Sequence, residues 1–171
     1  LSGALSRTTA GGLVFTTGTL HLNGAASQAI NPTGSTFGSV QLSNANGATM
    51  SAAATLLGDL DLANGTLAMN GNGLTLSGST SSITRSSGNL SSTGTVSFTG
   101  SGAQTADLST SSALASATIN ASKAGSLTFY SGMSIGYFTV GAATGYDLAF
   151  NATGAGVQTT TISNTPTFSN T

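Results

Sequence analysis

Two aspartates that lie two residues apart are the residues of this chain whose spacing would suit metal binding or acid–base catalysis. Asp59 and Asp61 alternate with Leu60 and Leu62, so a strand there would place both carboxylates on one face, about 7 Å apart. Such a pair could ligate Ca²⁺ or work as an acid and a base. A solvated strand edge explains the same spacing without chemistry, and we prefer it. We predict no metal site; Asp59 and Asp61 would be its ligands if there were one.

The remaining ionisable residues are too few for most catalytic sites. The 171 residues include 3 Lys+Arg, 4 Asp+Glu and 1 His, with a formal net charge of -1. His21 stands between Leu20 and Leu22, so strand alternation turns it outward. Asp107 and Asp147 have no partner visible in the sequence, and no Gly-x-Ser-x-Gly elbow in an α/β context supports a Ser-His-Asp triad. We predict that the protein is not an enzyme and uses no cofactor.

Charge and hydropathy exclude two classes of partner. Binding to nucleic acid needs a row of cations against the phosphates, and Arg7, Arg85 and Lys123 cannot form one. A membrane span needs about 20 consecutive apolar residues. The densest apolar stretch, residues 52–57, is soon followed by two aspartates. We therefore predict no nucleic-acid partner and no membrane span.

The composition favours short strands. Ser, Thr, Gly, Ala and Asn fill 116 of the 171 positions and Glu is absent, so the residues that cover helix surfaces are missing. Only residues 111–121 could hold a short helix, and their end is typical of a strand. Apolar alternations such as Leu74-x-Leu76 and Val96-x-Phe98 predict strands that each bury one face. We expect an all-β protein with almost no helix.

A heptapeptide organises these strands. The pattern Gly-Thr-apolar-x-apolar-Asn/Thr-Gly occurs at residues 18–24, 65–71 and 94–100, and describes a short strand with a turn residue at each end. Short strands separated by Gly, Ser and Asn corners predict a parallel β-solenoid, in which stacked coils bond only their neighbours. The alternative is an antiparallel β-sandwich of the pilin kind, because Asn-Gly pairs also favour hairpins.

A longer repeat suggests how the chain is divided. Several segments resemble other segments that lie about 76 to 81 residues later in the chain. Loop insertions between repeating units would produce this gradual increase of the offset. We predict a lead-in strand at 1–17 and one all-β domain at 18–171, with similar halves at 18–93 and 94–171. Because the first residue is Leu and not Met, we expect a processed chain whose secretory signal has been removed.

One part of the sequence resembles a known group of proteins. Residues 94–104, followed by 117–122 and 126–129, resemble the degenerate repeats of large exported bacterial surface proteins, the autotransporters and the filamentous-haemagglutinin-like adhesins. The resemblance extends over about residues 18–150. It implies a right-handed β-helix, located outside the cell or on its surface, that works as a stalk, an adhesin or a matrix component.

A solenoid without end caps raises the question of assembly. Its terminal coils leave backbone N–H and C=O groups unpaired, and no polar helix or charged loop in the sequence covers them. We expect these ends to pair with copies of the same chain, by stacking or by strand donation. The residues that we expect at the contacts are Leu13, Val14, Phe15, Val157, Ile162 and Phe168.

These observations lead to two functional hypotheses. The first is a structural subunit of an extracellular filament, sheath or surface layer that assembles with itself through terminal strands or open sheet edges. The alternative is a surface adhesin, or a β-solenoid that binds ice or carbohydrate. Tyr130, Tyr137 and Tyr146 are the candidate aromatic contacts, either to surface glycans or between subunits. A polysaccharide-cleaving β-helix would need more acidic and basic groups.

Overall fold

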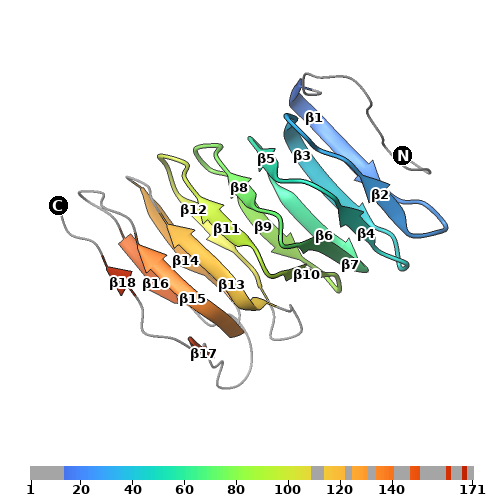
Figure 1. Cartoon of the computed structure of the whole chain (residues 1–171). Coiled ribbons are helices and arrows are strands. Elements are labelled where there is room, and N and C mark those ends of the chain that lie inside the picture. Colours follow the sequence, from blue (N-terminus) through green and yellow to red (C-terminus); the bar gives the residue numbers. More distant parts are fainter. Residues whose placement is uncertain are drawn as a thin grey trace.

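Short parallel strands stack into a β-solenoid in the computed structural model of this chain (Figure 1). The structure describes residues 14–108, 114–121, 125–130, 134–140, 147–150, 161–162 and 167–168. Within these residues every pair of bonded strands is parallel. The predicted parallel solenoid is confirmed, and the antiparallel sandwich is wrong. No helix in the described part is long and apolar enough to cross a membrane.

The strands form three columns, and the four coils from β2 to β12 pass through all three. The first column contains β2 (Gln28–Ile30), β4 (Ala48–Met50), β7 (Thr66–Asn70) and β10 (Asn89–Ser92). The second column begins with the first residues of β1 (Val14–Leu22) and β3 (Thr36–Ser43) and continues through β5 (Ala54–Leu56), β8 (Leu74–Leu76), β11 (Thr95–Phe98), β13 (Leu114–Ala121), β15 (Ser134–Val140) and β18 (Thr167–Phe168). The third column begins with the last residues of β1 and β3 and continues through β6 (Leu60–Asn64), β9 (Ser82–Arg85), β12 (Gln104–Ala106), β14 (Ser126–Phe129) and β16 (Asp147–Phe150). The short strand β17 (Thr161–Ile162) pairs with the start of β15.

The coil is the unit that repeats. Ala48 pairs with Leu67, and Leu60 pairs with Ile83, so one coil takes about 20 residues. The three predicted heptapeptides lie in three different columns: the first ends β1, the second contains β7 and the third contains β11. The pattern therefore encodes a strand between two corners, and any column can use it.

The offset of 76 to 81 residues has a different meaning. Leu67 and Leu148, which match at this offset, lie in β7 of the first column and β16 of the third. The predicted boundary between residues 93 and 94 falls between consecutive strands of one coil, and β1 runs across the boundary between 17 and 18. The division into two similar halves remains an interpretation of the sequence.

The core consists of rows of apolar side chains that point inward, one from each coil. We call one of them the Leu20–Phe150 row; in the third column it contains Leu20, Val40, Leu60, Ile83, Ala106, Phe129 and Phe150. Its five inner members are buried. A row of the second column contains Phe15, Phe37, Leu56, Leu76 and Phe98. Backbone pairing continues this column to residues 121, 140 and 168. Because neighbouring strands lie about 4.8 Å apart, each row is a continuous apolar stack.

The Asn-Gly pairs form corners between parallel strands. Gly47 and Gly65 have φ angles of 72° and 83°, the left-handed conformation that glycine allows, and Asn70 has a φ of 53°. Each of these corners lies between strands of two different columns. The residue types that favour a hairpin therefore turn the chain around the solenoid instead.

Candidate interaction surfaces

A row of polar side chains on the outer face of the third column contains His21. His21 Nδ1 lies 2.8 Å from Gln41 Oε1, which is an acceptor, so the ring nitrogen donates. Gln41 Nε2 donates to Asp61 Oδ2 at 2.7 Å, and Thr84 Oγ1 donates to Asp61 Oδ1 at 3.4 Å. The Gln41 amide thus lies between His21 and Asp61 in this row. The outward orientation predicted for His21 is confirmed.

Asp59 belongs to a second outward row of the same column. Its carboxylate Oδ1 accepts hydrogen bonds from Ser82 N at 2.9 Å and Ser82 Oγ at 2.8 Å, and its own backbone N–H donates to Ser39 Oγ at 3.0 Å. Asp61 lies on β6, whereas Asp59 immediately precedes that strand, so the prediction that both lie on one strand is correct for Asp61 only. Each carboxylate bonds a residue of a neighbouring coil. Among the described residues, no three His, Asp or Glu side chains lie close enough together to hold a metal ion. The two carboxylates serve here as links between coils.

Arg85 and Asp107 form an ion pair between neighbouring coils. Arg85 Nε lies 3.7 Å from Asp107 Oδ1, with both side chains about a quarter exposed. This partner of Asp107 could not be predicted from the sequence, because the stacking of β9 and β12 brings the two residues together. A partly exposed pair of this kind contributes little to stability.

Of the three tyrosines predicted as aromatic contacts, the two that the structure describes lie in different columns. Tyr130 follows β14 in the third column and is half-buried, whereas Tyr137 lies in β15 of the second column and is 51% exposed. Tyr146 lies outside the described residues. Ser134, which stands in a Gly-x-Ser-x-Gly sequence, is the first residue of a strand and not of the strand-to-helix turn that a nucleophile elbow needs.

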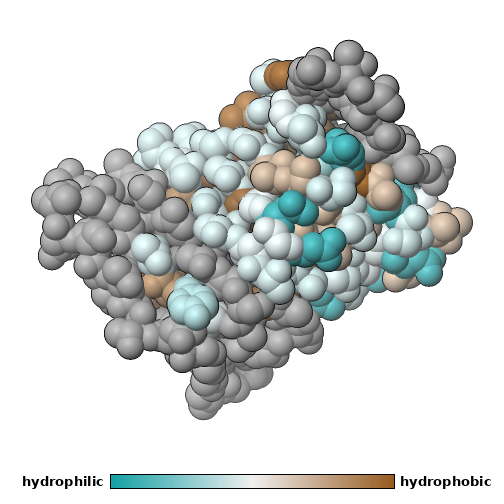
Figure 2. Space-filling view, in the orientation of Figure 1, coloured by the Kyte–Doolittle hydropathy of each residue, from teal (hydrophilic) through white to brown (hydrophobic). Residues whose placement is uncertain are grey.

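The surface between these features is weakly polar. Figure 2 shows the described part of the visible face as mostly pale, the colour of residues near the middle of the hydropathy scale, with a few hydrophilic residues in teal. The second column contributes an outward row in which Thr36 pairs with Thr55, Thr55 with Thr75, and Thr75 with Ser97. These hydroxyl groups can hydrogen-bond water or a ligand without any charge.

The residues predicted for assembly lie at opposite ends of the stack where the structure describes them (Figure 1). Val14 and Phe15 belong to β1 and are 65% and 47% exposed. Ile162 and Phe168 belong to β17 and β18, which pair with β15 at the other end. Leu13 and Val157 lie outside the described residues. Among the described strands, β3 alone pairs with β1, so the other edge of β1 has no described partner.

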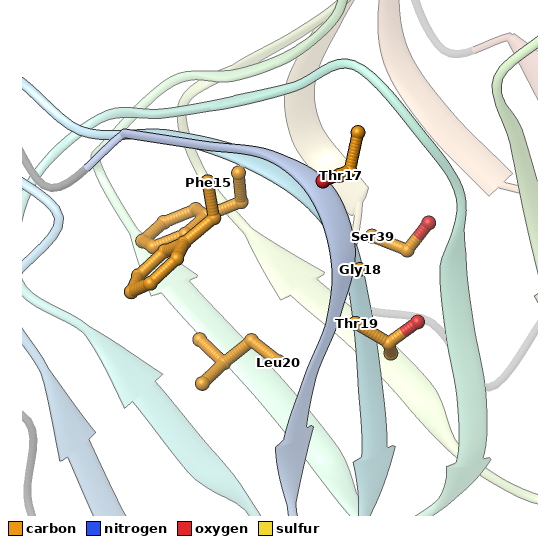
Figure 3. A pocket seen from close by; sticks show the side chains of 7 residues that line it. Phe15, Thr17, Gly18, Thr19, Leu20 and Ser39 are labelled. Atoms are coloured by element: carbon orange, nitrogen blue, oxygen red, sulfur yellow. The ribbon is translucent and has the colours of Figure 1, made fainter.

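A pocket of about 190 Å³ opens beside this edge. Figure 3 shows Phe15 and Leu20 on one side of the β1 ribbon and Thr19 and Ser39 on the other. Phe37, which also lines the pocket, stacks on Phe15 with ring centres 6.3 Å apart. The pocket is therefore the place where the apolar core reaches the end of the solenoid.

An exposed aromatic ring that the sequence analysis missed lies near the other end. Phe150 in β16 is 44% exposed and stacks on Phe129 with ring centres 5.3 Å apart and planes at 13°. Its Leu-x-Phe alternation is typical of a core residue. Only the position of β16 as the last strand of the third column leaves one side of the ring uncovered.

Comparison with known proteins adds no family to this geometry. No protein-family model matches the chain, and neither a curated protein nor a solved structure matches it. The function must therefore be inferred from the chain's own residues and their arrangement.

Proposed function

We propose that this chain is a structural subunit of an extracellular filament, sheath or surface layer, and that it assembles with copies of itself through the open edges of its solenoid. The observation that carries the proposal is the outer edge of β1, with no described partner and with Val14 and Phe15 exposed beside it. An exposed strand edge next to apolar side chains is a site where another strand can add.

The placement of the charged groups supports a structural role over a catalytic one. Asp59, Asp61, Arg85 and Asp107 all contact neighbouring coils of the third column. A net charge of -1 provides little repulsion between copies. The resemblance to exported surface proteins supports an extracellular location.

Mass in solution tests the proposal. Multi-angle light scattering over a wide range of concentrations should give masses that rise well above the 16.5 kDa of one chain. The variant Val14→Asp places a charge at the edge and should lower the extent of assembly at least tenfold. Leu57→Asp is the matched control, because Leu57 is also an exposed apolar residue but follows β5 within the stack. A wild-type chain that is monomeric at every concentration would refute the proposal.

A binding role is the second candidate, and the outward row of Thr36, Thr55 and Thr75 is the observation that favours it. Hydroxyl groups about 4.8 Å apart on a flat face could order water as an ice-binding surface does. The row is only one threonine wide on each strand. Thermal hysteresis in the wild type, lost in Thr55→Lys, would support this role, and its absence would remove ice binding from consideration.

A further inference from the structure

We infer that two copies of this chain join head to head, with β1 of one copy paired antiparallel to β1 of the other across a two-fold axis. The inference rests on the proposed function and specifies its contact. It names the surface that the partner contributes, which an open edge alone does not.

The edge of β1 lacks the charges that usually protect an exposed strand. Residues 14–19 are all exposed, and residues 14–20 include neither a charged residue nor a proline. Charged side chains and prolines are the residues that most often prevent a second strand from adding to an edge. Val, Phe and Thr also favour extended backbone. The edge is therefore suited to accept another strand.

A bend in β1 restricts what can pair with this edge. β1 passes from the second column to the third along one partner, β3, and its register shifts between Phe15 and Thr19. Gly18 lies at the bend and has a φ of 86° (Figure 3). A straight strand can follow only one arm of such an edge, whereas a second β1, turned about a two-fold axis through the bend, follows both. The edge is thus complementary to itself, as a two-fold contact requires.

The opposite end of the solenoid does not offer an equivalent edge. Its outermost described strands are β16, β17 and β18, which have 4, 2 and 2 residues. β18 adds to β15 in the second column after the chain has passed through β16 in the third, so the two columns end at different levels. β1, in contrast, presents 9 residues in one edge that spans both columns. Because β1 cannot contact β16 and β18 at once, a second β1 is the better partner.

The apolar pocket lies at the same bend. Its volume is about 190 Å³, and Phe15, Leu20 and Phe37 provide its apolar lining. Phe15 and Leu20 pair with buried residues of β3, so both lie on the inner side of the sheet. A two-fold axis near residues 17 and 18 brings Phe15 of each copy toward Leu20 of the other on that side. One contact then covers the pockets of both copies, and the apolar area that it removes from water stabilises the pair.

A single cysteine tests the contact. The chain has no cysteine, and Thr17 is exposed at the bend, so Thr17→Cys brings two thiols together where β1 meets β1. Opposed residues of antiparallel strands have Cβ atoms about 5 Å apart, close to the range of a disulfide. Under oxidising conditions we expect Thr17→Cys to form a covalent dimer at least tenfold faster than Thr66→Cys. Thr66 is the matched control, because it is an exposed threonine on β7, between β4 and β10.

Charges at the edge provide a second measurement. Phe15→Asp or Val14→Asp, each added to Thr17→Cys, should slow the cross-link at least tenfold, because the charge has to be buried in the contact. Leu57→Asp replaces an exposed apolar residue within the stack and should leave the rate unchanged. Because both edge variants should give the same loss, a folding defect in one leaves the other as the test.

The outcomes separate this inference from the proposed function. Filaments of Thr17→Cys that form no disulfide dimer would overturn the inference, and the proposed function would stand. Equal rates for Thr17→Cys and Thr66→Cys would also overturn it, because random collision would then explain the disulfide. A wild-type chain that stops at a dimer would support the head-to-head contact and contradict a filament. A chain that does not assemble at all refutes both.

Discussion

Two buried glutamines close corners of the solenoid in the same way. Gln28 Oε1 accepts the N–H of Gly24 at 2.9 Å, and Gln104 Oε1 accepts the N–H of Gly100 at 3.1 Å. Gln104 also donates to Ser81 Oγ at 2.7 Å. A side chain that satisfies a corner N–H replaces the water that the buried corner excludes.

Replacement of these glutamines by methionine should destabilise the fold. Gln28→Met and Gln104→Met keep the volume but leave a buried N–H without its acceptor, so each should lower the free energy of unfolding by about 1–3 kcal/mol. Gln41→Met is the control, because the partners of Gln41 lie on an outer face where water can replace it. Urea denaturation measures the difference, and equal losses in all three variants would show that the corners have no special role.

The glycines at the two ends of β7 should differ in their tolerance of a side chain. Gly65 has a φ of 83°, and a Cβ there would overlap the carbonyl oxygen of Asn44. A Cβ on Gly71 would have as its nearest neighbour Thr93 Oγ1, at 3.8 Å. We expect Gly65→Ala to lower stability by about 1–3 kcal/mol and Gly71→Ala by well under 1 kcal/mol. Thermal unfolding compares them, and a tolerant Gly65 would contradict this description of the corner.

At the scale of the strands, the sequence predicted the elements better than their arrangement. Leu60-x-Leu62 and Leu74-x-Leu76 form the strands β6 and β8, because alternation is a local property. Which strands stack is not local. Gln28 and Gln104 are two of the residues that match at the long offset, 76 residues apart. They mark one kind of corner used in two columns, so their spacing does not measure the repeat.

The candidate sites could be predicted only where they depend on the local alternation of residues along a strand. The outward positions of His21 and Asp61 follow from alternation, whereas the Gln41 bridge between them depends on the register of three coils. The exposure of Phe150 depends on which strand is last in its column. Neither register nor the order of strands in a stack can be derived from a pattern of short strands.

Hydrogen exchange should detect assembly strand by strand. In the isolated chain, backbone amides of β1 should exchange faster than those of β6, because β1 has a described neighbour on one side only and β6 lies between β3 and β9. Assembly should slow exchange in residues 14–22 at least tenfold as concentration rises and leave residues 60–64 unchanged. Protection that does not depend on concentration would show that β1 is not the contact.

At the scale of the whole molecule, the solenoid behaves as a one-dimensional stack whose coils contact only their neighbours. Its columns of parallel strands run along the stack, so a second copy can add strands at an end of the stack by the same kind of backbone pairing. With a net charge of -1, such an extension meets little electrostatic opposition. The properties of the terminal coils therefore decide whether the protein remains a monomer.

The central claim is that copies of this chain continue each other's solenoid. The most direct test is electron microscopy of the concentrated protein, with the power spectrum of any filament as the measurement. Stacked parallel coils predict a layer line at about 4.8 Å along the filament axis. Particles that remain single at all concentrations, or filaments whose 4.8 Å spacing runs across the axis, would contradict the claim.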